Sequence, residues 1–129
     1  MPPRDPEDEK IITLARAAQQ RAYAPHTGVA EGAAVRDTDG RTYAAATVEH
    51  RQERLSTSAL RGAVSAAASS GARRFEAVAV VTPHGVACAD DVQLVAEFGD
   101  DIAVFVATPD GEVQREFLVG EVLGSPDLA

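Results

Sequence analysis

The stretch that decides the fold runs from Thr47 to Arg61 and reads TVEHRQERLSTSALR. Its pattern predicts the end of a strand, then a polar loop, then the start of a helix. Ser56 or Thr57 is the expected N-cap of this helix, and Gly71 is its expected end. The helix start, Ser58-Ala59-Leu60-Arg61, is the expected place for a functional site, yet none of its side chains is suited to acid–base catalysis.

Upstream of this stretch, the sequence predicts a helix and a β-hairpin. Asp5 is a good N-cap and Pro6 favours the first helical position, so a helix is expected from Pro6 to about Tyr23. Residues 1–5 are expected to be a disordered lead. Asp39-Gly40 is a strong hairpin signal, and the flanking segments 32–35 and 41–48 are therefore predicted to be antiparallel strands.

Downstream, two nearly continuous apolar runs predict strands that are covered on both faces. These runs are Phe75 to Val81 and Ile102 to Ala107. A helix is expected between them, from about Asp90 to Phe98, and an edge strand and a helical turn are expected at 113–117 and 119–123. The order α-β-β-α-β-α-β-β-α predicts one domain, residues 1–129, with a three-layer α-β-α fold and a mixed sheet of about five strands.

Composition and charge exclude several classes of protein. The 129 residues include 20 acidic and 12 basic side chains, and the net charge of −8 argues against a nucleic-acid-binding surface. No apolar run approaches the roughly 20 residues that a membrane-spanning helix needs, and the N-terminus does not resemble a secretion signal. A cytoplasmic protein is therefore expected. Cys88 is the only cysteine, which excludes an intrachain disulfide and a cysteine-rich zinc site.

Short motifs along nearly the whole chain resemble the cytidine deaminase family. Residues 22–27, Ala-Tyr-Ala-Pro-His-Thr, followed by Gly-Ala-Ala at 32–34, are similar to the family's A-Y-A-P-Y-S-x-F-x-V-G-A-A. Residues 47–50, Thr-Val-Glu-His, resemble its N-V-E-N, and residues 93–98, Gln-Leu-Val-Ala-Glu-Phe, look like its Q-V-L-A-E-F. The order and spacing of these motifs carry the resemblance, which implies the cytidine deaminase fold.

The resemblance also implies a zinc-dependent deaminase site, but the residues at its positions differ. In the family, zinc held by Cys or His activates water and a Glu carries protons. The family's C-A-E-R falls on residues 58–61, so Ser58 replaces a zinc ligand and Leu60 replaces the catalytic Glu. Its P-C-x-x-C falls on residues 87–91, where Cys88 is kept and Asp91 replaces the second cysteine. The expected protein therefore has no zinc, no other cofactor and no catalytic residue.

Positions that would contact a nucleoside are altered as well. By the resemblance, the base-stacking Phe falls on Val29, and the Asn and Glu that hold the ribose fall on Thr47 and Glu49. Only Glu49 keeps the family's residue type. A nucleoside held through Glu49 is one interpretation. The plainer one is that Glu49 is solvated in a charged loop with His50, Arg51, Glu53 and Arg54.

A rescued metal site is an alternative, in which His84, Cys88 and Asp91 bind zinc with spacings of four and three residues. Against it, the proline and glycine that flank His84 predict a loop, where helical spacing does not bring side chains together. The plainer interpretations are a small buried thiol for Cys88 and a helix N-terminal charge for Asp91. Arg61 is expected to tie its helix to a neighbouring chain.

The sequence thus predicts a non-catalytic protein with the cytidine deaminase fold and a structural, regulatory or nucleoside-binding role. The alternative is a divergent zinc-dependent nucleoside deaminase or a related hydrolase. A homo-oligomer, dimer or tetramer, is expected, in part because the resemblance implies one. The other reason is the helix from Thr57 to Gly71, whose small residues, among them Ala63 and Ala67, would let a second helix approach closely. Nucleic acid and membrane are not expected partners.

Overall fold

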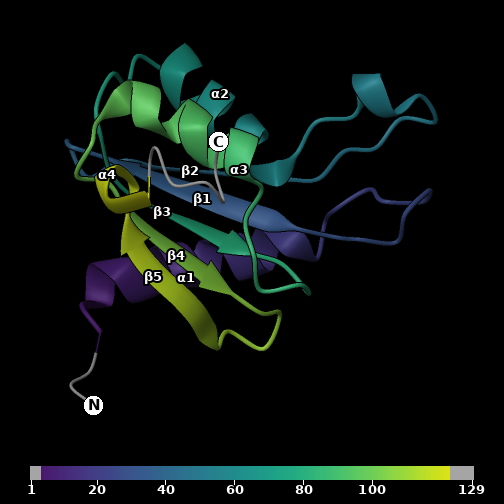
Figure 1. Ribbon diagram of the computed structural model, residues 1–129, viewed down its shortest axis with the longest axis horizontal. Coiled ribbons are helices and arrows are strands. Elements are labelled where there is room, and N and C mark those ends of the chain that lie inside the picture. The colour runs from purple at the N-terminus through teal and green to yellow at the C-terminus, as the bar shows by residue number, and fades with distance from the viewer. Residues whose placement is uncertain (1–3, 123–129) are drawn as a thin grey trace.

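A five-stranded sheet with the strand order β2-β1-β3-β4-β5 organises the chain, and the computed structural model describes residues 4–122 (Figure 1). The parallel pair is β3 with β4, and every other pair of neighbours is antiparallel. The strands are β1 (Gly32–Asp37), β2 (Thr42–Ala46), β3 (Phe75–Val81), β4 (Ala103–Ala107) and β5 (Val113–Leu118). The predicted mixed sheet of five strands is therefore confirmed.

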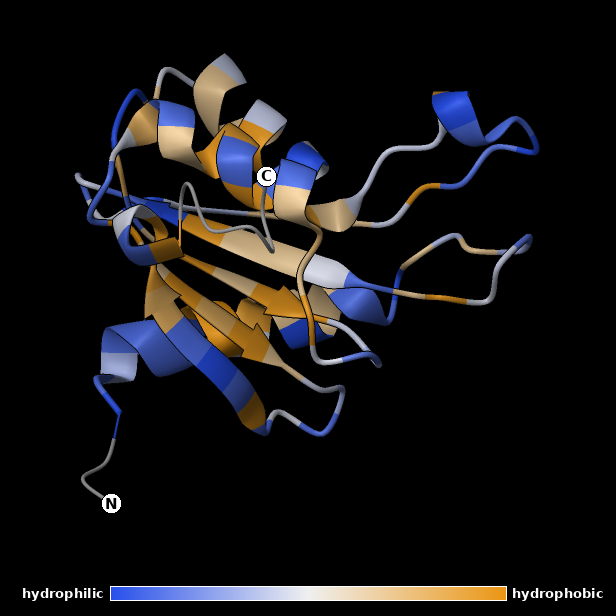
Figure 2. Cartoon of the chain, viewed as in Figure 1, coloured by the Kyte–Doolittle hydropathy of each residue, from blue (hydrophilic) through white to orange (hydrophobic). Residues whose placement is uncertain are grey.

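Helices cover both faces of this sheet and give it two cores. Helix α1 (Pro6–Gln19) packs on one face, and α2 (Ala59–Ser69) and α3 (Ala89–Val95) pack on the other, with the short α4 (Val119–Val122) beside α3. Successive strand residues point to opposite faces, so Val35 joins the core under α2, while its neighbour Ala34 joins the core under α1. The three-layer arrangement is confirmed, and Figure 2 shows that the central strands β3 and β4 are strongly apolar.

The first helix begins at the predicted residue. The Asp5 carboxylate accepts a hydrogen bond from the amide of Glu7 at 2.8 Å, and Pro6 is the first helical residue. Arg4 forms ion pairs with Glu9 and Glu116. The predicted disordered lead is therefore wrong for residues 4 and 5, and residues 1–3 lie outside the described part of the chain.

The same helix ends earlier than predicted, at Gln19 rather than near Tyr23. The amide of Tyr23 donates to the carbonyl of Thr47 at 2.9 Å, and the amide of Glu49 donates to the carbonyl of Tyr23 at 2.9 Å. These bonds place Tyr23 beside the segment after β2. A backbone that pairs with a distant segment cannot also continue the helix.

The predicted hairpin joins β1 to β2, with small differences at its ends. The buried Asp37 carboxylate accepts from the amides of Asp39 and Arg41 at 3.0 and 2.9 Å, and Gly40 takes a φ of +85°, which favours glycine. Strand β1 continues to Asp37, and β2 ends at Ala46 instead of Val48. Val48 leaves the sheet because it forms isolated bridges with residues 23 and 57.

Helix α2 begins later than predicted, and its N-cap is Ser58. The Ser58 hydroxyl accepts from the amide of Arg61 at 3.2 Å. Thr57 does not cap the helix because it exchanges two backbone hydrogen bonds with Val48, at 2.9 and 3.0 Å. Ser56 does not either, because its hydroxyl accepts from the amide of His50 at 2.8 Å. The loop before them contains a 3-10 turn at Glu53–Leu55.

The small residues of α2 serve packing within the chain. Ala63 and Ala67 are fully buried in the core between α2 and the sheet. A Cβ atom on Gly62 would lie 2.9 Å from the Cβ of Ala45, so the helix approaches β2 as closely as a glycine allows. The expectation that Ala63 and Ala67 lie on a contact between chains is therefore wrong.

The remaining elements match their predicted positions within a few residues. Helix α3 covers Ala89–Val95 and continues as a 3-10 turn at Ala96–Phe98, where one helix to Phe98 was predicted. Strand β5 lies at the sheet edge, as predicted. Helix α4 ends at Val122, and Leu123 of the predicted final turn lies outside the described residues. In residues 4–122 no helix is long and apolar enough to cross a membrane.

Candidate functional site

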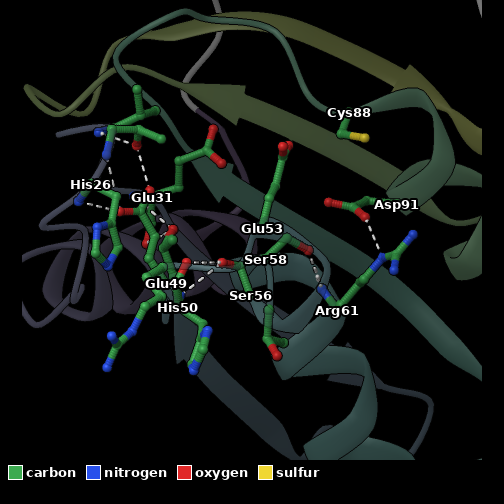
Figure 3. Close-up of a pocket in the computed structure, with 15 residues that line it drawn as sticks. His26, Glu31, Glu49, His50, Glu53, Ser56, Ser58, Arg61, Cys88 and Asp91 are labelled. Carbon is green, nitrogen blue, oxygen red and sulfur yellow. Dashed lines mark hydrogen bonds and ion pairs between the residues drawn. The ribbon is translucent and has the colours of Figure 1, made fainter.

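An open pocket of about 540 Å³ lies where the loops at 26–31 and 47–58 meet the N-termini of α2 and α3 (Figure 3). His26, Glu31 and Glu49 lie at one end of the pocket, and Cys88, Asp91 and Arg61 lie at the other. The structure thus brings together the site residues predicted from the sequence, except Leu60 and the His84 of the alternative metal site. Those that line the pocket are Val29, Thr47, Glu49, Ser58, Cys88 and Asp91.

An ion pair joins α2 to α3 at the helix end of the pocket. Nε of Arg61 donates to Oδ1 of Asp91 at 2.8 Å. The Asp91 side chain is 8% exposed, whereas that of Arg61 is 54% exposed, so a buried carboxylate is paired with a half-solvated guanidinium. Asp91 lies in the first turn of α3, as predicted, but it also forms this specific pair. The expected role of Arg61 was a contact to a neighbouring chain, and its observed partner belongs to its own chain.

Leu60 lies apart from the other predicted site residues. Its side chain is 3% exposed and belongs to the core between α2 and the sheet, and it does not line the pocket. A substitution at this position therefore changes the core first. Leu60 offers the pocket neither a proton donor nor an acceptor.

Ser58 and Cys88, the other two positions in the altered motifs, lie at helix starts. The Ser58 hydroxyl is occupied as the N-cap of α2. Cys88 is the N-cap residue of α3 without a capping side-chain hydrogen bond, and its thiol is exposed. The prediction of a buried Cys88 is wrong, because the open pocket lies directly over the start of α3.

These side chains do not fit a zinc ion. A neutral serine hydroxyl is a poor zinc ligand. The Asp91 carboxylate is already paired with Arg61, and the guanidinium beside it would repel a cation at this place. His84 is exposed in the turn after β3 and does not line the pocket. Within residues 4–122, no three His, Cys, Asp or Glu side chains are grouped so that they could hold a metal ion. The rescued ligand set of His84, Cys88 and Asp91 therefore does not form.

Glu49 holds the two loops together at the other end of the pocket. Its carboxylate accepts from the amides of His26 and Thr27 at 2.8 and 3.1 Å and from the Thr27 hydroxyl. The Thr27 hydroxyl, followed by these amides, holds the pKa of Glu49 below its ordinary value of 4.5. The plain interpretation of a merely solvated Glu49 is therefore wrong, since this side chain is a structural acceptor.

Thr47 and Val29 shape the pocket without offering free polar groups. The Thr47 hydroxyl accepts from the amide of Glu31 at 3.1 Å and donates to its carbonyl at 3.3 Å. Val29 is half-buried and supplies apolar surface. No sequence pattern singles out Glu31, because a lone glutamate before a strand carries no distinctive signal.

Comparisons with known proteins agree with this architecture. The family model described as "Cytidine deaminase-like" matches residues 4–111. A cytidine deaminase of Sporosarcina psychrophila is 32% identical over 111 residues, which cover 83% of this chain and 82% of that protein.

Solved structures of cytidine deaminases are similar over most of the chain. That of the Burkholderia pseudomallei enzyme has a TM-score of 0.80 at 32% identity and covers 88% of this chain and 93% of its own. That of the Mycobacterium tuberculosis enzyme has a TM-score of 0.78 at 28% identity and covers 94% of this chain and 97% of its own. Sequence and structure together show that this chain belongs to the cytidine deaminase-like family.

Proposed function

We propose that this chain is a zinc-free, non-deaminating member of its family that binds a nucleoside in its pocket without converting it. The observation that carries the proposal is the Arg61–Asp91 ion pair, which joins the starts of α2 and α3 at 2.8 Å. By the family resemblance this is the place of the zinc ligands. A salt bridge there supplies neither a thiolate pair nor an open coordination position.

The surroundings of the ion pair support the absence of deamination. Zinc deaminases require a Glu that acts as general acid and base beside the metal-bound water. The residue at that position, Leu60, points into the core. Ser58 is occupied as a helix cap, and Asp91 is occupied by Arg61. The helix end of the pocket therefore supports binding better than proton transfer.

The pocket itself supports ligand binding. Its volume of about 540 Å³ falls within the roughly 300–1,000 Å³ of small-molecule sites. Its two ends are held by Glu49 and by the Arg61–Asp91 pair, so its form is maintained by contacts within the chain. The named relatives are cytidine deaminases, which makes pyrimidine nucleosides the first ligands to test.

Three measurements on the untagged full chain test the proposal. After incubation with excess zinc and desalting, metal analysis is expected to find far less than one zinc per chain. Incubation with cytidine is expected to yield no uridine above the uncatalysed rate. Thermal-shift measurements with a panel of pyrimidine nucleosides are expected to raise Tm in a saturable manner. Stoichiometric zinc together with saturable uridine formation would establish the alternative, a divergent deaminase.

We also propose that the chain forms a homo-oligomer, dimer or tetramer. Large apolar side chains on the loops beside the pocket support this: Tyr23, Val48 and Leu55 are 59%, 56% and 50% exposed. Light scattering at micromolar concentration is expected to give at least twice the monomer mass of 13.5 kDa. Leu55→Glu should weaken the assembly, whereas Leu118→Glu, an exposed leucine on the edge strand β5, is the matched control. A monomeric mass for the unmodified chain would refute this proposal.

A further inference from the structure

We propose that Arg61 selects the ligand through a carbonyl-type acceptor, so that the pocket binds a 4-keto pyrimidine nucleoside such as uridine more tightly than the 4-amino nucleoside cytidine. This inference rests on the proposed function and specifies its ligand. It depends on the division of hydrogen-bond donors and acceptors between the two ends of the pocket.

At the helix end of the pocket, Arg61 offers donors. The ion pair with Asp91 uses Nε of Arg61 and anchors the guanidinium to a buried carboxylate. Among the described residues, Nη1 and Nη2 of Arg61 have no hydrogen-bond partner, and the side chain lines the pocket. A guanidinium has only donors, so these nitrogens can meet a carbonyl oxygen but oppose an amino group. Arg61 is thus anchored through Nε, while its two Nη donors remain available to a ligand.

The loop end and the middle of the pocket offer acceptors. Within residues 4–122, the carboxylates of Glu31 and Glu53 have no hydrogen-bond or ion-pair partner, and both residues line the pocket (Figure 3). The Glu49 carboxylate is already occupied by residues 26 and 27. Free carboxylates accept hydrogen bonds from hydroxyl groups, such as those of a sugar.

The charges of the pocket favour a neutral ligand over an anion. Glu31, Glu49 and Glu53 are acidic, and the carboxylate of Asp91 offsets the charge of Arg61. A phosphate group would meet these carboxylates and be repelled. A nucleoside with hydroxyls at one end and a keto oxygen at the other satisfies the free groups at both ends, whereas a nucleotide does not.

The difference between a keto and an amino group gives the expected size of the effect. A hydrogen bond from a charged donor contributes enough for about tenfold in affinity, and placing a donor against a donor forfeits it. Because Arg61 is half-solvated, we expect a preference of about tenfold for uridine, well below that of a fully buried recognition site.

Calorimetric titration of the full chain with uridine, cytidine and uridine monophosphate tests this inference. Uridine is expected to bind about tenfold more tightly than cytidine, and the monophosphate more weakly than uridine. The combined variant Arg61→Gln with Asp91→Asn leaves no buried charge, and its glutamine can both donate and accept hydrogen bonds. This variant should therefore bind uridine and cytidine with about equal affinity. Arg21→Gln is the matched control, because this exposed arginine lies outside the pocket lining, and it should keep the preference.

The outcomes separate this inference from the proposed function. Equal affinity of the unmodified chain for uridine and cytidine, or an unchanged preference in the combined variant, would overturn the role of Arg61 and leave nucleoside binding intact. Binding of none of these ligands would overturn both. Release of uridine from cytidine during the titration would overturn the proposed function, and the affinities measured for uridine would still test Arg61.

Discussion

The two ends of the pocket are both held by a carboxylate, but in opposite surroundings. At the loop end, Glu49 accepts hydrogen bonds from neutral groups, two amides and a hydroxyl, in loops near solvent. At the helix end, Asp91 is buried and pairs with the cation of Arg61. By the family resemblance, Glu49 keeps the expected residue type and yet has a structural role, whereas Asp91 lies where a cysteine is expected and pairs with Arg61. The residue type alone thus does not show whether a side chain at either end of the pocket binds a ligand or holds the chain together.

The largest expected effect is that of Leu60→Glu, beside the helix end. Because Leu60 lies in the core, a carboxylate there should lower the free energy of unfolding by about 3–5 kcal/mol. The variant should not form uridine from cytidine, since Ser58 and Asp91 are unchanged. Urea denaturation and a deamination assay measure the two effects. Leu60→Met is the control and should cost less than about 1.5 kcal/mol. Clear turnover by Leu60→Glu would contradict our account of the helix end.

A smaller and asymmetric effect is expected from breaking the Arg61–Asp91 pair. Arg61→Ala leaves a buried carboxylate without its partner and should cost about 2–3 kcal/mol, somewhat less than for a pair in which both partners are buried. Asp91→Ala leaves a guanidinium that water can hydrate and should cost about 1 kcal/mol. Urea denaturation of both variants measures the difference. The reverse order would mean that the guanidinium, not the carboxylate, is the desolvated partner.

At the loop end, Glu49→Gln should act locally. A neutral amide accepts more weakly than a carboxylate, so the amides of His26 and Thr27 should exchange hydrogen faster, while those of β3 stay protected.

The loop end should also loosen at low pH. The pKa of Glu49 is lowered in the folded chain, so its contribution is complete above the ordinary value of 4.5 and is lost as the pH falls through the lower folded value. Hydrogen exchange and NMR shifts of these two amides between about pH 5 and 2 measure it. Amides that titrate identically in the Glu49→Gln variant would show that another group is responsible.

The smallest effect is expected at the opposite end of α2, far from the pocket. Nη1 of Arg73 donates to the carbonyls of Ala68 and Ala72 at 2.8 Å each, in an exposed position after the helix. Arg73→Ala should therefore cost about 0.5 kcal/mol or less in urea denaturation and leave ligand binding unchanged. A loss comparable to that of Arg61→Ala would remove the contrast between the two ends of the helix.

The sequence by itself determined the order of elements and most of their positions. The hairpin follows from Asp39-Gly40, the first helix from Asp5 and Pro6, and the buried strand from the apolar run 75–81. These signals are local, because turn chemistry, capping and side-chain period act within a few residues of one another. The residues that the motif resemblance places at a nucleoside site, apart from Leu60, line one pocket.

Only the tertiary structure decided what the site residues do. The bridges of Val48 to residues 23 and 57, the hydrogen bonds of Glu49 to residues 26 and 27, and the Arg61–Asp91 pair all join segments that are 9 to 30 residues apart. The burial of Leu60 and the exposure of Cys88 likewise depend on which face each helix start turns to the sheet. A sequence pattern states what a side chain is able to bind, but its partner depends on which segments the folded sheet brings together.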